Sequence, residues 1–284
     1  MKAGFIGLGH LGTAMAKRLL AEGVDLSVWN RTREKASALS APLADSPAGL
    51  ISAVEVLFMN LFDSRAVDEV INGAKGLLSG DCRGKIVIDT TTNHFDSVAG
   101  FHESLKKQGA SYLEAPVLGS VAPALQGALT VLVSGERQAY EKALPLLEKI
   151  GKTIFFLGEP PSATKMKLIN NLVLGSFMAT LAEALALAEK AGTDKAKAID
   201  ILSAGAGNSM VLAAKKAALL NEDFTTQFSS ALIYKDLHYL QDLARSLGGP
   251  LFTGSITKEL FGMTFAKGLD RLDFSGIYRV MKGL

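Results

Sequence analysis

The sequence predicts an α/β domain with a doubly wound parallel sheet, followed by an all-α domain, the two joined by a long helix. Three observations lead to this fold class. Short apolar runs alternate with helical patterns over roughly the first 160 residues. After Gly192 every periodic segment is helical. Between these halves, the stretch from Ser162 to Gly192 has no proline and a single glycine before its end, which indicates one uninterrupted helix.

The composition is that of an ordinary folded protein. The 284 residues are 48% hydrophobic and 20% charged, enough for one large or two modest domains. A net charge of +2 gives no field that would attract nucleic acid or a membrane, so we expect neither as a partner. The single cysteine, Cys82, excludes an internal disulfide, and we expect an unreactive thiol. No signal peptide is recognisable, and we predict a soluble cytoplasmic protein.

A glycine motif follows the first predicted strand. Ala3 to Ile6 is apolar, Gly7-Leu8-Gly9-His10-Leu11-Gly12 comes next, and helical spacing begins at Thr13. In this context Gly7 makes a tight turn, Gly9 lets the backbone approach a pyrophosphate, and Gly12 allows close packing of helix on strand. The phosphates then meet the N–H groups of the helix start. The motif therefore predicts a Rossmann-type dinucleotide site formed by these six residues.

The end of the second strand predicts which nucleotide binds. Val24 to Trp29 is followed by Asn30-Arg31-Thr32-Arg33, where an NAD-binding protein usually has Asp or Glu for the ribose hydroxyl. Guanidinium groups can instead grip a 2′-phosphate by paired hydrogen bonds. We therefore expect these four residues to bind NADP(H) in preference to NAD(H). The alternative is that the charges are solvated at the start of a helix from Thr32 to Leu39.

Further strands and helices complete the first domain, which we assign to residues 1–161. We expect strands at Val54 to Leu61, Lys85 to Asp89, Ser111 to Leu113, Thr130 to Val133 and Ile154 to Leu157, all in one sheet. The segments Asp89 to Asn93 and Glu114 to Ser120 each follow a strand, where a ligand of such a sheet binds. Both are also compatible with ordinary turn chemistry.

The second domain, residues 162–284, contains the long helix 162–191 and four more predicted helices. Lys167 and Asn171 are one turn apart and share a face of the long helix. The alternative is an exposed first turn in which Lys165 and Lys167 are solvated. Spacing alone favours an exposed ion pair for Lys235-Asp236. The histidines have no metal-ligand spacing, so we predict no metal site.

These motifs together resemble the β-hydroxyacid dehydrogenase family, which includes 3-hydroxyisobutyrate dehydrogenase and the tartronate semialdehyde and glyoxylate/succinic semialdehyde reductases. The resemblance covers essentially the whole chain and agrees with the predicted fold. It rests on the segments Gly7 to Gly12, Asp89 to Thr92, Glu114 to Val117 with Gly119, Lys167 to Asn171, and Lys235 to Leu237.

The resemblance implies roles for particular residues. Lys167 would be the general acid/base, and Asn171 would orient both the lysine and the substrate oxygen. Lys235 would reach cofactor and substrate, while Thr92 and Leu61 would line the cofactor site. The chemistry is consistent, because an alkoxide forming by hydride transfer needs a proton and a nearby positive charge, and one ammonium supplies both.

Two departures from the family pattern concern the substrate. Leu118 stands where the family commonly has a serine that binds the substrate carboxylate. A carboxylate would then rely on Gly119 and Ser120, unless the substrate is bulkier or less acidic. This stretch looks more like the glyoxylate/succinic semialdehyde branch. Pro160-Pro161 replaces a glycine-rich loop before Lys167, which stiffens that approach.

We therefore predict an NADPH-dependent reductase of small aldehyde or keto acids, reversible as a dehydrogenase of β-hydroxyacids, that forms a homodimer or homotetramer. One alternative is an imine reductase, but such enzymes generally lack the lysine. Another is a non-catalytic NADP-binding interaction or sensor protein, and such relatives also tend to lose it.

Overall fold

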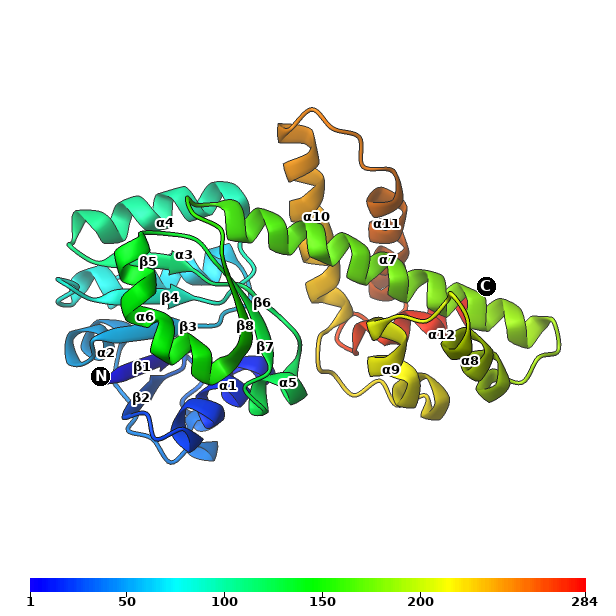
Figure 1. Cartoon of the computed structure of the whole chain (residues 1–284), viewed down its shortest axis with the longest axis horizontal. Helices are drawn as coiled ribbons and strands as arrows, with labels where there is room; N and C mark the ends of the chain where they lie inside the picture. Colours follow the sequence, from blue (N-terminus) through cyan, green and yellow to red (C-terminus); the bar gives the residue numbers. More distant parts are fainter. The chain divides into compact units, whose positions relative to one another are not determined.

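The computed structural model describes residues 1–284, apart from the side chain of Ala38. The chain divides into two compact units, residues 1–167 and residues 168–284 (Figure 1). The first unit is α/β and the second is helical, so the predicted fold class is confirmed.

A five-stranded parallel sheet forms the centre of the first unit (Figure 1). Its spatial order is β2 (Leu26–Trp29), β1 (Ala3–Ile6), β3 (Val56–Met59), β4 (Ile86–Asp89) and β5 (Ser111–Glu114). The chain passes from β1 to β2 and then returns to β3 on the other side of β1. The order therefore reverses between β1 and β3, and in such sheets ligands bind outside the carboxyl ends of the strands at this point.

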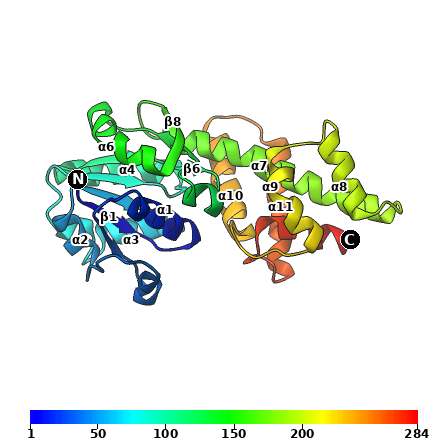
Figure 2. The same ribbon diagram turned by 60° about the horizontal axis from the view of Figure 1, so that its bottom comes forward.

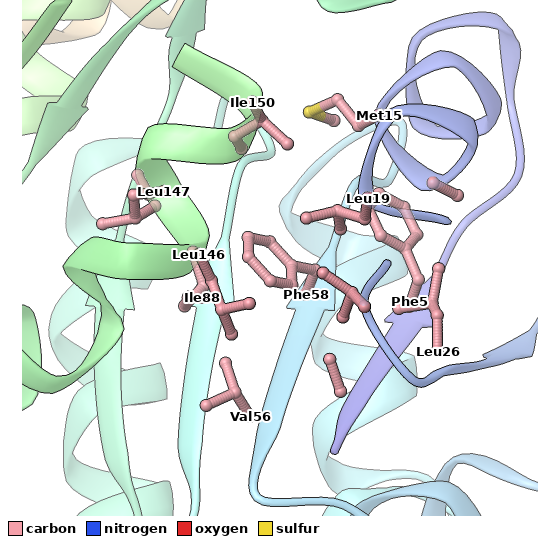
Figure 3. Packing of buried hydrophobic residues seen from close by; sticks show 14 of the residues in the cluster. Phe5, Met15, Leu19, Leu26, Val56, Phe58, Ile88, Leu146, Leu147 and Ile150 are labelled. Atoms are coloured by element: carbon pink, nitrogen blue, oxygen red, sulfur yellow. The ribbon is translucent and has the colours of Figure 1, made fainter. Parts of the chain in front are cut away.

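Two apolar clusters cover the two faces of this sheet. The first includes residues of α1 (His10–Ala21) and α6 (Arg137–Ile150), and the second includes residues of α2 (Pro47–Ala53), α3 (Ser64–Asn72) and α4 (Phe95–Lys107). Because alternate strand residues point to opposite faces, Phe5 belongs to the first cluster and Ile6 to the second. Figure 3 shows Phe5 and Phe58 in the first cluster, and their rings stack with centroids 6.0 Å apart.

Two predictions about the first unit are wrong. The segments predicted to complete the main sheet form a separate one with the order β6 (Val117–Leu118), β7 (Leu129–Val133) and β8 (Gly151–Phe156). Pro116 has no N–H with which to extend the ladder after β5, and β6 then pairs antiparallel with β7. The predicted α-helix from Thr32 to Leu39 is a 3₁₀ helix, η1 (Arg33–Ala38). Shorter helices η2 (Leu77–Ser79) and α5 (Val121–Leu125) complete the unit.

The second unit contains most of α7 (Ser162–Lys190), whose first six residues belong to the first unit. The other helices are α8 (Lys195–Ala204), α9 (Met210–Asn221), α10 (Ser230–Ser246), α11 (Phe252–Ala266), η3 (Phe274–Gly276) and α12 (Ile277–Lys282). Figures 1 and 2 show α10 and α11 side by side. Helix α7 is long and apolar enough to cross a membrane by length and composition alone. Core helices of soluble proteins meet the same criterion, and 44% of the most apolar 18-residue window of α7 is buried.

Ionic contacts around Glu222 connect the C-terminal helix α12 to the rest of the second unit. The Glu222 carboxylate lies 2.8 Å from the ammonium of Lys195 and 3.0 Å from that of Lys282. Hydrogen bonds from these two lysines lower the pKa of Glu222 to about 2. Lys282 also lies 3.7 Å from Glu189, which accepts a hydrogen bond from Tyr278. The chain end is thus held by a small charge network.

The first prediction concerns this network. The pKa of Glu222 is lower in the folded chain than its ordinary value of 4.5, so its contribution to stability is present above pH 4.5 and is lost as the pH falls towards about 2. We expect Glu222→Gln to lower the free energy of unfolding in urea at pH 7, and the deficit to shrink steadily below pH 4.5. Glu148→Gln, at an exposed position of α6, is the control. A deficit that does not change between pH 7 and pH 3 would contradict the prediction.

Candidate functional site

The glycines of the first motif differ in what surrounds them. Gly7 has a φ of +96°, and a Cβ there would lie 2.2 Å from the carbonyl oxygen of Asn60. At Gly12 a Cβ would lie 2.0 Å from the carbonyl oxygen of Gly7. At Gly9 a Cβ would meet no described atom within 4 Å. Packing within the chain therefore explains the first two glycines, whereas the open space at Gly9 fits the approach of a nucleotide pyrophosphate.

The end of β2 is bonded to this motif. The Leu8 N–H donates to the Oδ1 of Asn30 at 2.8 Å, and the Nδ2 of Asn30 donates to the Thr32 carbonyl at 2.7 Å. Helix α1 starts at His10, and its N-cap residue Gly9 has no side chain to accept the N–H groups of the first turn. Leu11, in that turn, is half-buried. N–H groups of such a helix start attract anions. The structure thus brings the six-residue motif and Asn30 together.

Two arginines flank this segment at the surface. Arg31, Thr32 and Arg33 are all exposed, and Arg33 lies 3.3 Å from the carboxylate of Asp45. The arginines therefore remain within reach of a ligand in solution, without a buried structural role.

Hydrogen bonds join the ends of β3 and β4. The Leu61 N–H donates to the Thr91 hydroxyl at 2.9 Å, and Asn60 donates to the Thr90 hydroxyl at 2.9 Å. Leu61 and Thr92 are both half-buried at this edge of the sheet. The predicted cofactor residues Leu61 and Thr92 thus follow two neighbouring strands of the parallel sheet.

Asp89 holds the loop that carries Thr92. Its buried carboxylate accepts hydrogen bonds from the Thr91 N–H at 2.9 Å, from the amide of Asn93 at 2.8 Å and from the Tyr112 hydroxyl at 2.7 Å. Burial raises the pKa of Asp89, and these hydrogen bonds oppose the rise. The pKa of the Tyr112 phenol is raised well above its ordinary value, mainly by burial. The sequence identified the motif but gave neither Asp89 nor Tyr112 this role.

Lys167 is held by the segment that follows β5. Only 8% of the residue is exposed, and its ammonium donates a hydrogen bond to the Val117 carbonyl at 2.8 Å. The alternative in which Lys167 is solvated is therefore wrong. Glu114, the last residue of β5, accepts hydrogen bonds from the N–H groups of Ala163 and Thr164, both at 3.1 Å. Burial raises the pKa of Glu114, and the hydrogen bonds that it accepts oppose the rise.

The predicted substrate residues come next along the chain. Leu118 is half-buried in β6, and Gly119 is exposed with a φ of +121°. The hydroxyl of Ser120 is buried, and no described residue provides a hydrogen-bond partner for it. A substrate oxygen could satisfy this hydroxyl.

In the second unit, a buried carboxylate fixes Asn171. The Nδ2 of Asn171 donates to the Oδ2 of Asp236 at 2.7 Å, and the two residues are 0% and 1% exposed. The ammonium of Lys235 lies 2.8 Å from the Oδ1 of Asp236 and 4.7 Å from the ring centre of Tyr239. The alternative of an exposed ion pair, which spacing alone favours, is therefore wrong, because both side chains are largely buried.

The sequence alone assigned no role in the site to Asp236. Within α10 it shares a buried face with Ile233, Leu237 and Leu240. A carboxylate on an apolar helix face needs a polar partner, and the position of Asp236 among apolar residues of this helix could have indicated its burial. The structure thus places two predicted residues, Asn171 and Lys235, around one carboxylate.

Family comparisons cover both units. The model for the NAD binding domain of 6-phosphogluconate dehydrogenase matches residues 2–158. The model described as NAD-binding of NADP-dependent 3-hydroxyisobutyrate dehydrogenase matches residues 162–281.

Two similar relatives have different names. Glyoxylate/succinic semialdehyde reductase 2, chloroplastic, of Arabidopsis thaliana is 33% identical over 98% of this chain and 79% of that protein. Cytokine-like nuclear factor N-PAC of Gallus gallus is 36% identical over 98% of this chain. The chain spans about half of the length of N-PAC, 51%.

Solved structures with the same fold include Psf3 in complex with NADP+ and 2-OPP, which is 30% identical with a TM-score of 0.90 over 98% of this chain and 99% of that one. Mycobacterium tuberculosis 3-hydroxyisobutyrate dehydrogenase, solved with L-serine, is 25% identical with a TM-score of 0.85 over 99% of each chain. A Streptomyces aurantiacus imine reductase, 24% identical with a TM-score of 0.68 over 99% of this chain and 100% of that one, shares the fold alone.

The family models and the relatives cover nearly the whole chain, and the ranges matched by the two family models include Gly7 and Lys167, respectively. This confirms the resemblance: the chain belongs to the β-hydroxyacid dehydrogenase family, the 3-hydroxyisobutyrate dehydrogenase-like NAD(P)-dependent oxidoreductases that act on hydroxyl or carbonyl groups.

Proposed function

We propose that this protein is an NADPH-dependent reductase of small aldehyde or keto acids, able to run in reverse on β-hydroxyacids, with Lys167 as its general acid/base. The observation that carries the proposal is the buried ammonium of Lys167, bonded to the Val117 carbonyl beside the segment Leu118 to Ser120. A buried cation at the strand ends of a nucleotide-binding sheet suits a reaction in which negative charge develops on oxygen.

A nicotinamide nucleotide held by the residues Gly7 to Gly12 would supply the hydride. As the carbonyl carbon of the substrate accepts it, the oxygen becomes negative and takes a proton from the Nζ of Lys167. The bond to Val117 fixes the position of this ammonium, so that little reorganisation is needed at the moment of transfer. In the reverse direction, neutral Lys167 accepts the proton of the hydroxyl group.

Asn171 orients the lysine and the substrate oxygen in this proposal. Its Nδ2 is committed to Asp236, and its Oδ1 accepts from Asn170 at 3.2 Å, which fixes the direction in which the amide points. Lys235 reaches cofactor and substrate from its place beside Asp236. Thr92 would line the nicotinamide site, and Leu61 would contribute to the cofactor site.

The substrate carboxylate binds to Gly119 and Ser120. Leu118 has no hydrogen-bonding side chain, so the backbone N–H groups that follow it and the buried Ser120 hydroxyl take its place. The 33% identity with a glyoxylate/succinic semialdehyde reductase supports short acid aldehydes as the first substrates to assay.

NADP(H) is the preferred cofactor in this proposal. Asn30 stands where a carboxylate would repel a 2′-phosphate, and the exposed Arg31 and Arg33 are suited to bind one. The NADP+ complex of Psf3 supports the same choice. We further propose a cytoplasmic homodimer or homotetramer.

A second candidate is a non-catalytic NADP-binding interaction protein, favoured by the 36% identity with a cytokine-like nuclear factor. It predicts tight binding of NADP(H) without turnover of any carbonyl compound. The buried, bonded Lys167 favours the enzyme.

The second prediction tests the lysine. Lys167→Met removes the ammonium and keeps an apolar stem, and general acid/base catalysis typically contributes at least about 100-fold to a rate. We expect kcat for NADPH oxidation with glyoxylate or succinic semialdehyde to fall by at least that factor, with the Kd for NADPH unchanged. Lys165→Met, two residues earlier in the same helix, is the matched control. Full turnover by Lys167→Met would refute the assignment.

The third prediction tests the cofactor preference. A charge-assisted hydrogen bond contributes about 1.5–3 kcal/mol, so losing the contact between Arg31 and a 2′-phosphate corresponds to roughly tenfold or more in affinity. We expect Arg31→Ala to raise the Kd for NADPH by that factor, measured by cofactor fluorescence, and to leave the Kd for NADH unchanged. Arg65→Ala, at an exposed arginine of α3, controls for the loss of surface charge. Equal weakening of both cofactors would contradict the assignment.

A further inference from the structure

The N-cap residue of α7, the helix that carries Lys167, has no side chain that can accept a hydrogen bond. The first intrahelical hydrogen bond of this helix runs from the Lys165 N–H to the Pro161 carbonyl at 3.0 Å, which makes Pro161 the N-cap residue. Proline has no side-chain oxygen with which to accept the N–H groups of the first turn, the usual function of Ser, Thr, Asp or Asn at this position. The N–H groups of Ser162, Ala163 and Thr164 therefore need acceptors from elsewhere.

Glu114, 49 residues before Ala163, provides most of them. Its Oε1 accepts from the Ala163 N–H at 3.1 Å, and its Oε2 accepts from the N–H of Thr164 at 3.1 Å and from the Thr164 hydroxyl. The Ser134 hydroxyl also accepts from the Ala163 N–H at 3.0 Å, and the Ser162 N–H donates to the Glu159 carbonyl at 3.2 Å. A carboxylate suits this position, because it accepts without donating and the start of a helix favours negative charge.

The segment that begins at Glu114 also contacts Lys167. The Val117 carbonyl, three residues after Glu114, accepts the hydrogen bond from the Lys167 ammonium at 2.8 Å. Lys167 lies three residues after Thr164, so the two side chains are neighbours on one face of α7. The segment 114–117 thus holds the start of α7 at two points, its first turn and its lysine. A displacement of the first turn would move the ammonium relative to Val117 and to the residues that follow it.

We propose that Glu114, through its bonds to Thr164 and Ala163, is a positioning residue that sets the place of the Lys167 ammonium. This inference rests on the proposed function of Lys167. Glu114 is 1% exposed and acts through the helix, without itself touching substrate or cofactor. The glutamate of the Glu-Ala-Pro-Val motif thereby acquires a function in the reaction that its burial in the fold would not by itself suggest.

Three variants test the proposal. Thr164→Val keeps the shape of the side chain and removes the hydroxyl that bonds to Glu114, whereas Thr164→Ser keeps the hydroxyl. Glu114→Gln keeps the size but turns an N–H group towards donors. We expect Thr164→Val and Glu114→Gln to lower kcat about tenfold or more, while KM and the Kd for NADPH change less than about twofold, since both act on the position of the proton donor. The variant Thr164→Ser, which keeps the hydroxyl, should have a kcat near the wild-type value.

A second readout needs no turnover. The amine reagent trinitrobenzenesulfonate is applied to the cofactor-free protein, and labelling of Lys167 and Lys165 is compared by peptide mass spectrometry. Lys167 is buried and bonded, whereas Lys165 is half-buried in the same turn. The ratio of Lys167 to Lys165 labelling should rise at least about threefold in Thr164→Val and Glu114→Gln, because loss of the bonds between Glu114 and Thr164 weakens the bond from Lys167 to Val117. The ratio should be unchanged in Thr164→Ser.

The outcomes separate the two proposals. If the wild-type protein binds NADPH but reduces no carbonyl compound, the proposed function fails, and the labelling ratio still decides whether Glu114 places Lys167. If Thr164→Val and Glu114→Gln fold and keep both the wild-type kcat and the wild-type ratio, the positioning inference is overturned. A lowered melting temperature with an unchanged ratio would also overturn it, because Glu114 would then be a stabilising cap alone.

Discussion

Two buried carboxylates at the carboxyl ends of neighbouring strands organise the loops of the first unit. Asp89 ends β4 and Glu114 ends β5, and the two residues are register partners in the parallel sheet. Burying a carboxylate costs free energy unless donors converge on it, and here each is surrounded by backbone and side-chain donors. Each carboxylate therefore fixes the chain segments that surround it: one the loop with Thr92, the other the first turn of α7. The placement of the loop with Thr92 and of the first turn of α7 follows from satisfying these two groups.

The local sequence contained most of the fold, for physical reasons. A strand, a glycine motif and a helix in succession are local patterns, and so is a helix of 29 residues without proline. Pairing between strands is not local. The sequence could not indicate that β7 and β8 leave the main sheet, since their apolar patterns are the same in either sheet and only the break at Pro116 hints at the change.

The candidate site divides in the same way. Lys167 and Asn171 were recognisable from their spacing, but their burial was not, because it depends on what packs against the helix. Asp236 was judged from its neighbour Lys235 as an exposed pair, whereas packing of α10 buries it beside Asn171. The role of Glu114 could not be predicted, since its partners are 49 and 50 residues away in the sequence. Contacts at such separations are properties of the folded chain.

The open space at Gly9 has a consequence of a different kind. The fold itself requires glycine at positions 7 and 12, because a side chain at either position would clash with the protein backbone. Gly9 meets no such obstacle in the part of the chain that the structure describes, so packing within the chain does not require the side chain to be missing. A methyl group added there would occupy volume that the chain leaves empty. In the proposed nucleotide site, a side chain at position 9 would therefore fill the space of the pyrophosphate while the sheet and the helices stay folded. Such a substitution would separate nucleotide binding from folding.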